Sequence, residues 1–193
     1  MCKFMFKNKI WTNKLLQTLG ILFVLSGGAF AQERTWNTFS PDNGAWSILA
    51  PGVMQPDEEA QKARSTMGSY SYSDYNGFFA VIYRDSPRRF VPWKPNYKAY
   101  FKKIRDDAIE AANGQLLKDE EYSNGNVKGR EVQIKIPDGR VMGRESQLKT
   151  KYRVERMRMF FHGKRFYLLV AVLPENKIDA PEIDSYLNSF IAK

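Results

Sequence analysis

The chain has 193 residues, and its 30 basic and 21 acidic side chains give a formal net charge of +9. With one cysteine and one histidine, it cannot form an internal disulfide, and a zinc or copper site would have to consist mostly of carboxylates. A composition of 43% hydrophobic and 26% charged residues is that of a globular domain.

The N-terminus has the three parts of a secretory signal peptide. An apolar run covers residues 15–25, which is shorter than the roughly 20 apolar residues of a membrane-spanning helix. Ala29-Phe30-Ala31 then supplies the small-x-small pattern that precedes a cleavage site, so we expect cleavage between Ala31 and Gln32. The leader has no acidic residue and carries four lysines: Lys3, Lys7, Lys9 and Lys14.

Residues 32–193 form the expected mature chain, a single periplasmic or extracellular domain with no transmembrane segment. Cleavage removes Cys2, and it leaves 26 basic against 21 acidic side chains, a net charge of +5. The remaining 162 residues are enough to bury a core without disulfides.

Alternating apolar residues and turn signals predict six or seven mostly antiparallel strands. Turns are expected at Asn76-Gly77, at 123–126 and at His162-Gly163. The strands are expected at 45–50, 68–75, 78–83, 116–122, 127–136, 147–161 and 165–173.

Two segments have helical spacing instead. The first is 96–113, with Gly114 at the position of a C-terminal cap. The second is a short helix near the C-terminus, with Asp179 as its cap and Pro181 in its first turn. We expect it to bury Ile183, Leu187 and Phe190. A sheet covered by helices, without alternating strand–helix units, is an α+β fold.

The strand at 147–161 changes its pattern near Glu155. The apolar residues Tyr152 and Val154 are at even positions, whereas Met157 and Met159 are at odd positions. A β-bulge near Glu155 would explain the change, and so would a sheet covered on different faces along its length.

Several segments of the mature chain resemble the PsbP-like family. The family's opening strand resembles 39–52, which follows Trp36. In the C-terminal half the likeness rests on Gly129-Arg130-Glu131, on Phe160-Phe161-His162-Gly163, on 165–170, and on the closing Ser189-Phe190.

The resemblance implies an α/β/α sandwich around a central antiparallel sheet. The family includes an accessory protein of the oxygen-evolving photosystem, a Ran-binding nuclear-import factor and secreted bacterial proteins of unknown role. The resemblance therefore implies a non-catalytic domain that docks on a larger partner. The family has no catalytic residue that could be transferred to this chain.

No segment has the pattern of an active site, and we predict no enzyme, cofactor or metal site. His162 precedes a glycine in a predicted turn, where a polar residue is expected in any case. The acidic triplets 57–59 and 119–121 lack the alternating ligand spacing of a calcium loop. There is also no cysteine nucleophile in the mature chain and no Gly-x-Ser-x-Gly motif.

The segment 84–95 is the first candidate binding site, a loop stiffened by three prolines. Arginine and tryptophan are frequent anchors of protein interfaces. The loop could instead cap the core with its aromatic residues while its arginines remain solvated. Its candidate partner-binding residues are Arg88, Arg89, Phe90, Trp93 and Lys94.

A second candidate is a basic patch on the strand 147–161, although charges on an exposed sheet also prevent aggregation. Its residues are Lys149, Lys151, Arg153, Arg156 and Arg158. We therefore expect an exported, non-catalytic binding or accessory domain that docks on another protein of the cell envelope. The alternatives are a small carboxylate-based hydrolase or ligand carrier, and a binder of anionic glycans or lipid head groups. We expect no nucleic-acid partner, because export separates the protein from the nucleic acids of its own cell.

Overall fold

The computed structural model describes residues 34–41, 44–58, 66–85, 97–125, 127–142 and 148–193, and for residues 97, 139–142 and 148–150 it describes the backbone alone. The secondary-structure elements are β1 Asn37–Phe39, β2 Trp46–Ala50, β3 Gln55–Pro56, β4 Met67–Asp74, β5 Gly77–Asp85, α3 Tyr97–Ala112, β6 Gln115–Asn124, β7 Val127–Met142, β8 Leu148–His162, β9 Arg165–Pro174, η2 Glu175–Lys177, α4 Pro181–Asn188 and β10 Ile191–Ala192.

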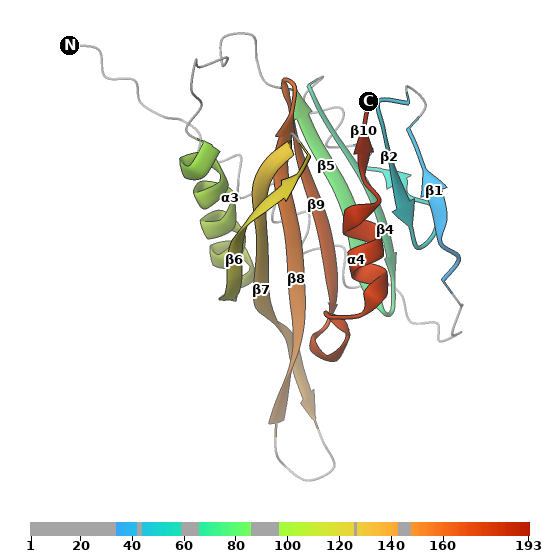
Figure 1. Ribbon diagram of the computed structural model, residues 1–193. Helices are drawn as coiled ribbons and strands as arrows, with labels where there is room; N and C mark the ends of the chain where they lie inside the picture. The colour runs from blue at the N-terminus through green and yellow to red at the C-terminus, as the bar shows by residue number, and fades with distance from the viewer. Residues whose placement is uncertain (1–33, 42–43, 59–65, 86–96, 126, 143–147) are drawn as a thin grey trace, which may run out of the picture.

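Seven strands form the main sheet in the order β3-β4-β5-β9-β8-β7-β6, and every neighbouring pair is antiparallel. A smaller sheet has the order β1-β2-β10. Helix α3 covers one face of the main sheet, whereas α4 and the small sheet lie on the other (Figure 1). We refer to these as the α3 face and the α4 face. The arrangement confirms the predicted α+β fold.

The turns of three hairpins, β4–β5, β6–β7 and β8–β9, lie close to where the turn signals predicted them. The turns after β6 and β8 each begin with a glycine of positive φ, Gly125 at 56° and Gly163 at 58°. Between β4 and β5 the prediction was one residue off, because Asp74 pairs with Gly77 and the turn is Tyr75-Asn76. The Asp74 carboxylate stabilises this turn by accepting hydrogen bonds from the backbone N–H groups of Asn76 and Gly77.

Helix α3 ends in a Schellman motif, in which Asn113 rather than Gly114 takes the left-handed conformation, with φ 46°. The N–H of Gly114 donates to the carbonyl of Ile109, and the N–H of Asn113 donates to that of Glu110. The glycine is still needed, because a Cβ at Gly114 would lie 2.6 Å from the Ile134 side chain. The cap prediction was therefore wrong by one residue.

Helix α4 begins at Pro181, as predicted, but its N-cap is Ala180 and not Asp179, and no side chain caps it. Ile183 and Leu187 are buried as expected. Phe190 lies beyond the helix end and is partly buried.

Strand β8 has no bulge near Glu155. Its register with both β7 and β9 is continuous through this residue, so the second explanation of the sequence pattern is the correct one. Val154 and Phe160 face α4, and Glu155, Met157 and Met159 face α3.

Each face of the main sheet has its own hydrophobic core. On the α4 face, Trp46, Phe79 and Tyr186 are fully buried, and the Tyr186 hydroxyl donates to the Ala80 carbonyl at 2.8 Å. On the α3 face, Phe101 and Ala108 of the helix pack against the sheet residues Val132, Ile134, Met157, Met159 and Val170.

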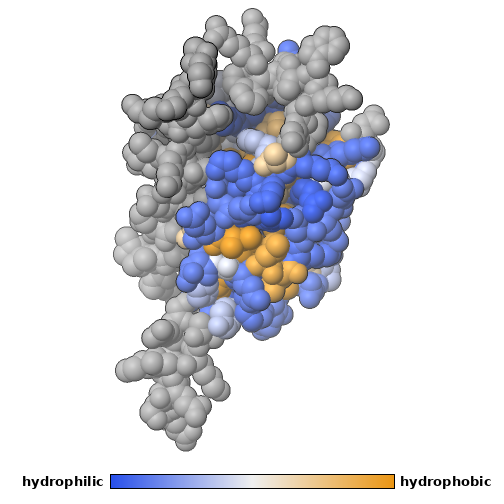
Figure 2. Space-filling view, turned by 90° about the vertical axis from the view of Figure 1, so that its left-hand side faces the viewer, coloured by the Kyte–Doolittle hydropathy of each residue, from blue (hydrophilic) through white to orange (hydrophobic). Residues whose placement is uncertain are grey.

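Strand β6 forms one edge of the main sheet and is mostly exposed. Its register with β7 shifts between Leu116 and Lys118, and the side chains of Leu116 and Leu117 are exposed. Figure 2 shows that hydrophilic residues cover most of the described surface on this side, around a small apolar patch. Among the described residues, no helix is both long and apolar enough to cross a membrane.

Candidate functional site

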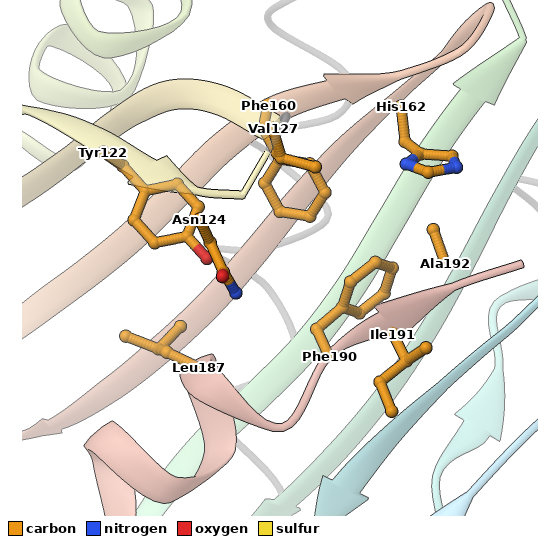
Figure 3. Close-up of a pocket in the computed structure, with 9 residues that line it drawn as sticks. All are labelled: Tyr122, Asn124, Val127, Phe160, His162, Leu187, Phe190, Ile191 and Ala192. Atoms are coloured by element: carbon orange, nitrogen blue, oxygen red, sulfur yellow. The ribbon is translucent and has the colours of Figure 1, made fainter.

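A pocket of about 260 Å³ lies on the α4 face, near the ends of β6 and β8 and the start of β7. The C-terminal end of α4 and strand β10 form its other side (Figure 3). It is therefore built from three separate parts of the chain. The residues that line it are Tyr122, Asn124, Val127, Phe160, His162, Leu187, Phe190, Ile191 and Ala192.

The aromatic residues of the pocket continue into the core of the α4 face. The rings of Phe160 and Phe190 are 5.4 Å apart, and Phe190 lies 4.9 Å from Tyr167. Phe190 also stacks on the buried Trp46 at 5.8 Å, with 24° between the ring planes. Because close-packed rings cannot move independently, the apolar part of the pocket is preformed.

A buried arginine supports the wall next to α4. The Arg158 guanidinium lies 4.1 Å from the centre of the Tyr122 ring and is 4% exposed. It donates to the Leu187 carbonyl at 2.8 Å, and so it ties β8 to the end of α4. Its charge is balanced by Glu131, which accepts hydrogen bonds of 2.7 and 2.9 Å from it.

Three polar side chains at the pocket have unused hydrogen-bonding groups. Asn124 and His162 are exposed, and Tyr122 is half-buried. Within the described part of the chain, neither the Asn124 amide, nor the His162 imidazole, nor the Tyr122 hydroxyl makes a hydrogen bond or an ion pair. An apolar pocket with a few free polar groups is the usual form of a binding site.

The described lining of the pocket contains no acidic side chain. None of the nine is an aspartate or glutamate, and His162 and Tyr122 are its titratable side chains. No group of three or more histidine, cysteine, aspartate or glutamate residues that could hold a metal occurs among the described residues.

Glu155 is the one buried carboxyl group in the described structure whose pKa is strongly raised, but it does not line this pocket. Burial raises its pKa from 4.5 to about 7. It lies on the α3 face, whereas the pocket is on the α4 face. The two are therefore separated by the sheet.

The first predicted site, Arg88, Arg89, Phe90, Trp93 and Lys94, lies outside the described residues. The structure divides the second between the two faces of β8. Lys151 is exposed, and Arg153 lies 2.8 Å from Asp138. Arg156 contacts Glu131 and Asp184, so it and the buried Arg158 are neutralised by carboxylates rather than exposed as free cations. The side chain of Lys149 is not among those described.

The sequence analysis did not find the pocket. Tyr122, Phe160 and Phe190 occupy positions that predict core packing, and they do belong to the edge of a core. His162 was assigned to a turn, but it is the last residue of β8 and pairs with Arg165, so the turn is Gly163-Lys164 and the prediction was one residue off. The pocket arises because α4 returns the C-terminus to the ends of β6 and β8, which no local pattern encodes.

Comparison with known proteins finds similarity in structure only, since no protein-family model and no curated protein sequence matches the chain. The cyanobacterial PsbP protein CyanoP of Synechocystis superposes with a TM-score of 0.55 at 10% identity, covering 88% of this chain and 99% of CyanoP. The protein has the PsbP-like fold. The Ran-binding protein Mog1p of Saccharomyces cerevisiae gives a TM-score of 0.46 at 11% identity, covering 82% of this chain and 96% of Mog1p.

The PsbP-like fold confirms the resemblance deduced from the sequence. Two of the motif residues make close tertiary contacts in this fold. Gly129 is packed against β8, where a Cβ would lie 2.0 Å from the Met159 carbonyl oxygen, and Ser189 accepts the N–H of Leu49 at 2.8 Å.

Proposed function

We propose that this chain is an exported, non-catalytic binding domain that docks on another protein of the cell envelope through the pocket between α4, β10 and the ends of β6 and β8. The observation that carries the proposal is the combination of an aromatic pocket with three side chains whose polar groups make no hydrogen bond or ion pair within the described part of the chain. Protein interfaces use buried apolar anchors surrounded by polar groups in this way. CyanoP, which shares the fold, is a PsbP protein by name, and Mog1p is named as a Ran-binding protein.

The hydrolase alternative has less support. A pair of carboxylates across a cleft is the usual requirement for glycoside hydrolysis. None of the nine described residues that line the pocket has a carboxylate, and Glu155 lies on the other side of the sheet.

Binding of anionic glycans or lipid head groups through the β8 patch is also less well supported. Arg156 and Arg158 already bind Glu131, so an anionic ligand would have to displace a carboxylate that is itself buried.

Export rests on the N-terminal leader, and it is tested by the mass of the protein recovered from a cell-envelope fraction. We expect a mature chain that begins at Gln32. A full-length chain recovered from the cytoplasm would contradict export, and it would leave the pocket argument in place.

Docking is tested by site-specific photocrosslinking in intact cells, with a photoreactive amino acid at Ile191. This side chain is at the pocket and is 59% exposed. Tyr75, which is 58% exposed, is the matched control. It lies in the β4–β5 turn, at the end of the main sheet opposite the pocket.

We expect the Ile191 probe to capture one envelope protein, and the Tyr75 probe not to capture it. Capture should be lost when Asn124→Ala and His162→Ala are combined in the same chain. Equal capture from both probes, or capture that survives the double substitution, would overturn docking at this pocket.

A further inference from the structure

Among the described strands, β10 is paired along one edge only, and we refer to its other edge, which borders the pocket, as the free edge. In the order β1-β2-β10 it is the terminal strand, and its described partner is β2. Ile191 and Ala192, the two residues of β10, both line the pocket. A strand edge carries main-chain donors and acceptors that can pair with another strand.

The register of β10 shows which residue directs its main chain toward the pocket side. Ile191 is opposite Ser47 and Ala192 is opposite Trp46, and the N–H of Lys193 donates to the carbonyl of Ala45 at 3.0 Å. In an antiparallel pair, residues alternate between bonding to the partner strand and pointing away from it. Because Lys193 bonds toward β2, the N–H and C=O of Ala192 point away from β2, to the free edge.

We propose that the free edge of β10 and the adjacent pocket together bind an extended segment of a partner protein, which pairs with the main chain of Ala192 and inserts one aromatic side chain into the pocket. This inference rests on the proposed docking function and specifies its mode. Main-chain pairing supplies affinity in such complexes, and a side-chain pocket supplies specificity.

The size of the pocket favours a side chain over a free small molecule. At about 260 Å³ it is smaller than the 300–1,000 Å³ of typical ligand sites. The rings of Phe160 and Phe190 would contact the inserted side chain, and Asn124 and His162 could bond to the main chain of the same segment.

The charges near the pocket indicate which residues of the partner segment should stand on either side of its aromatic residue. Lys164 follows His162 by two residues in the β8–β9 turn, and Lys193 follows Ala192. Both lysines are exposed and make no ion pair within the described part of the chain, and the pocket itself has no acid. A partner segment with acidic residues on either side of the aromatic side chain is therefore complementary to this surface, and its binding should weaken with added salt.

The test uses the mature protein and the peptide acetyl-Asp-Val-Phe-Val-Asp-amide, titrated by NMR of the ¹⁵N-labelled chain. We expect saturable shifts of the amide signals of Asn124, His162 and Ala192. Replacing the phenylalanine by alanine should weaken binding at least about tenfold, because the pocket is left empty. Methylating the peptide's backbone nitrogens should weaken it by a similar factor, because the main-chain bonds are lost.

Variants of the protein separate the parts of the site. Ala192→Pro removes the N–H of the free edge, and Lys193→Glu reverses the flanking charge. Each should weaken binding several-fold, and Tyr75→Ala should leave it unchanged. Because Ala192→Pro could disturb β10, the methylated peptide provides an independent test of main-chain pairing.

Failure of the peptide to bind at millimolar concentration would overturn the inference. Equal binding of acetyl-phenylalanine-amide alone would also overturn it, since the pocket would then be a small-molecule site. If the peptide fails while photocrosslinking from Ile191 still captures a partner, the docking function stands and only this mode of recognition falls. If both fail, both proposals fall.

Discussion

The carboxyl group of Glu155 is buried on the α3 face of β8, between Ile134 of β7 and Val172 of β9. Its side chain makes no hydrogen bond or ion pair in the described structure, and burial raises its pKa to about 7. The folded protein therefore keeps this proton up to about pH 7, whereas the unfolded chain loses it near the ordinary value of 4.5.

The stability of the protein should consequently depend on pH through this one residue. Its contribution to the free energy of unfolding is greatest below pH 4.5 and falls as the pH rises through about 7, by about 3 kcal/mol in all. In Glu155→Gln this loss should be absent, so the variant should be more stable than the parent at pH 8. Urea unfolding at pH 5, 6, 7 and 8 measures the effect.

His162→Gln is the control for Glu155→Gln, because it places a glutamine at an exposed position outside both cores. This exposed residue should leave the pH dependence intact. An unchanged pH dependence in Glu155→Gln would contradict the assignment.

Arg158 provides a second prediction at the scale of single residues. Arg158→Leu leaves the carboxylate of Glu131 buried with only Arg156 as a partner, and we expect a loss of about 3–5 kcal/mol in the free energy of unfolding. The double variant Glu131→Leu, Arg158→Leu should recover much of that loss, because no buried charge remains unbalanced. Urea unfolding of the two variants tests this prediction. A loss of less than about 1 kcal/mol in the free energy of unfolding of Arg158→Leu would refute it.

At the scale of secondary-structure elements, the stability of the β7–β8 hairpin depends on how closely its two strands approach each other. A Cβ at Gly129 would lie 2.0 Å from the Met159 carbonyl oxygen, so Gly129→Ala must push the strands apart. We expect a loss of at least about 1–3 kcal/mol, the usual cost of overpacking. Gly125→Asn, in the turn after β6, should change stability by less than 1 kcal/mol, because asparagine tolerates a positive φ and no atom lies within 4 Å of the new Cβ. Thermal unfolding of both variants measures the contrast.

The long elements could be predicted from the sequence, and the short ones could not. Alternation and turn residues placed β2 and the hairpins from β4 to β9 within about two residues, because those signals are local. The exception is β7, which continues to Met142 instead of ending at residue 136. Strands β1, β3 and β10 have two or three residues each and were not predicted, since they exist only because β2 and β4 lie beside them. The pocket was missed for the same reason, because one of its walls is β10.

For the whole molecule, the two cores share one sheet, and we expect them to unfold together. Strands β5, β8 and β9 contribute side chains to both cores, so neither core can be lost without the other. Unfolding followed by far-ultraviolet and near-ultraviolet circular dichroism should give coincident curves with one midpoint. Two separated midpoints would show that the cores behave as independent units.

The stacking of Phe190 on Trp46 has an optical consequence. Phe190 borders the pocket on one side and contacts the indole of a fully buried tryptophan on the other. An occupant that contacts the phenylalanine ring replaces the solvent beside it, and we expect this to change the emission wavelength or intensity of the stacked indole. The protein therefore contains an intrinsic fluorophore adjacent to the proposed docking pocket, and occupancy of the pocket could be followed without a label once Trp36 and Trp93 are replaced by phenylalanine.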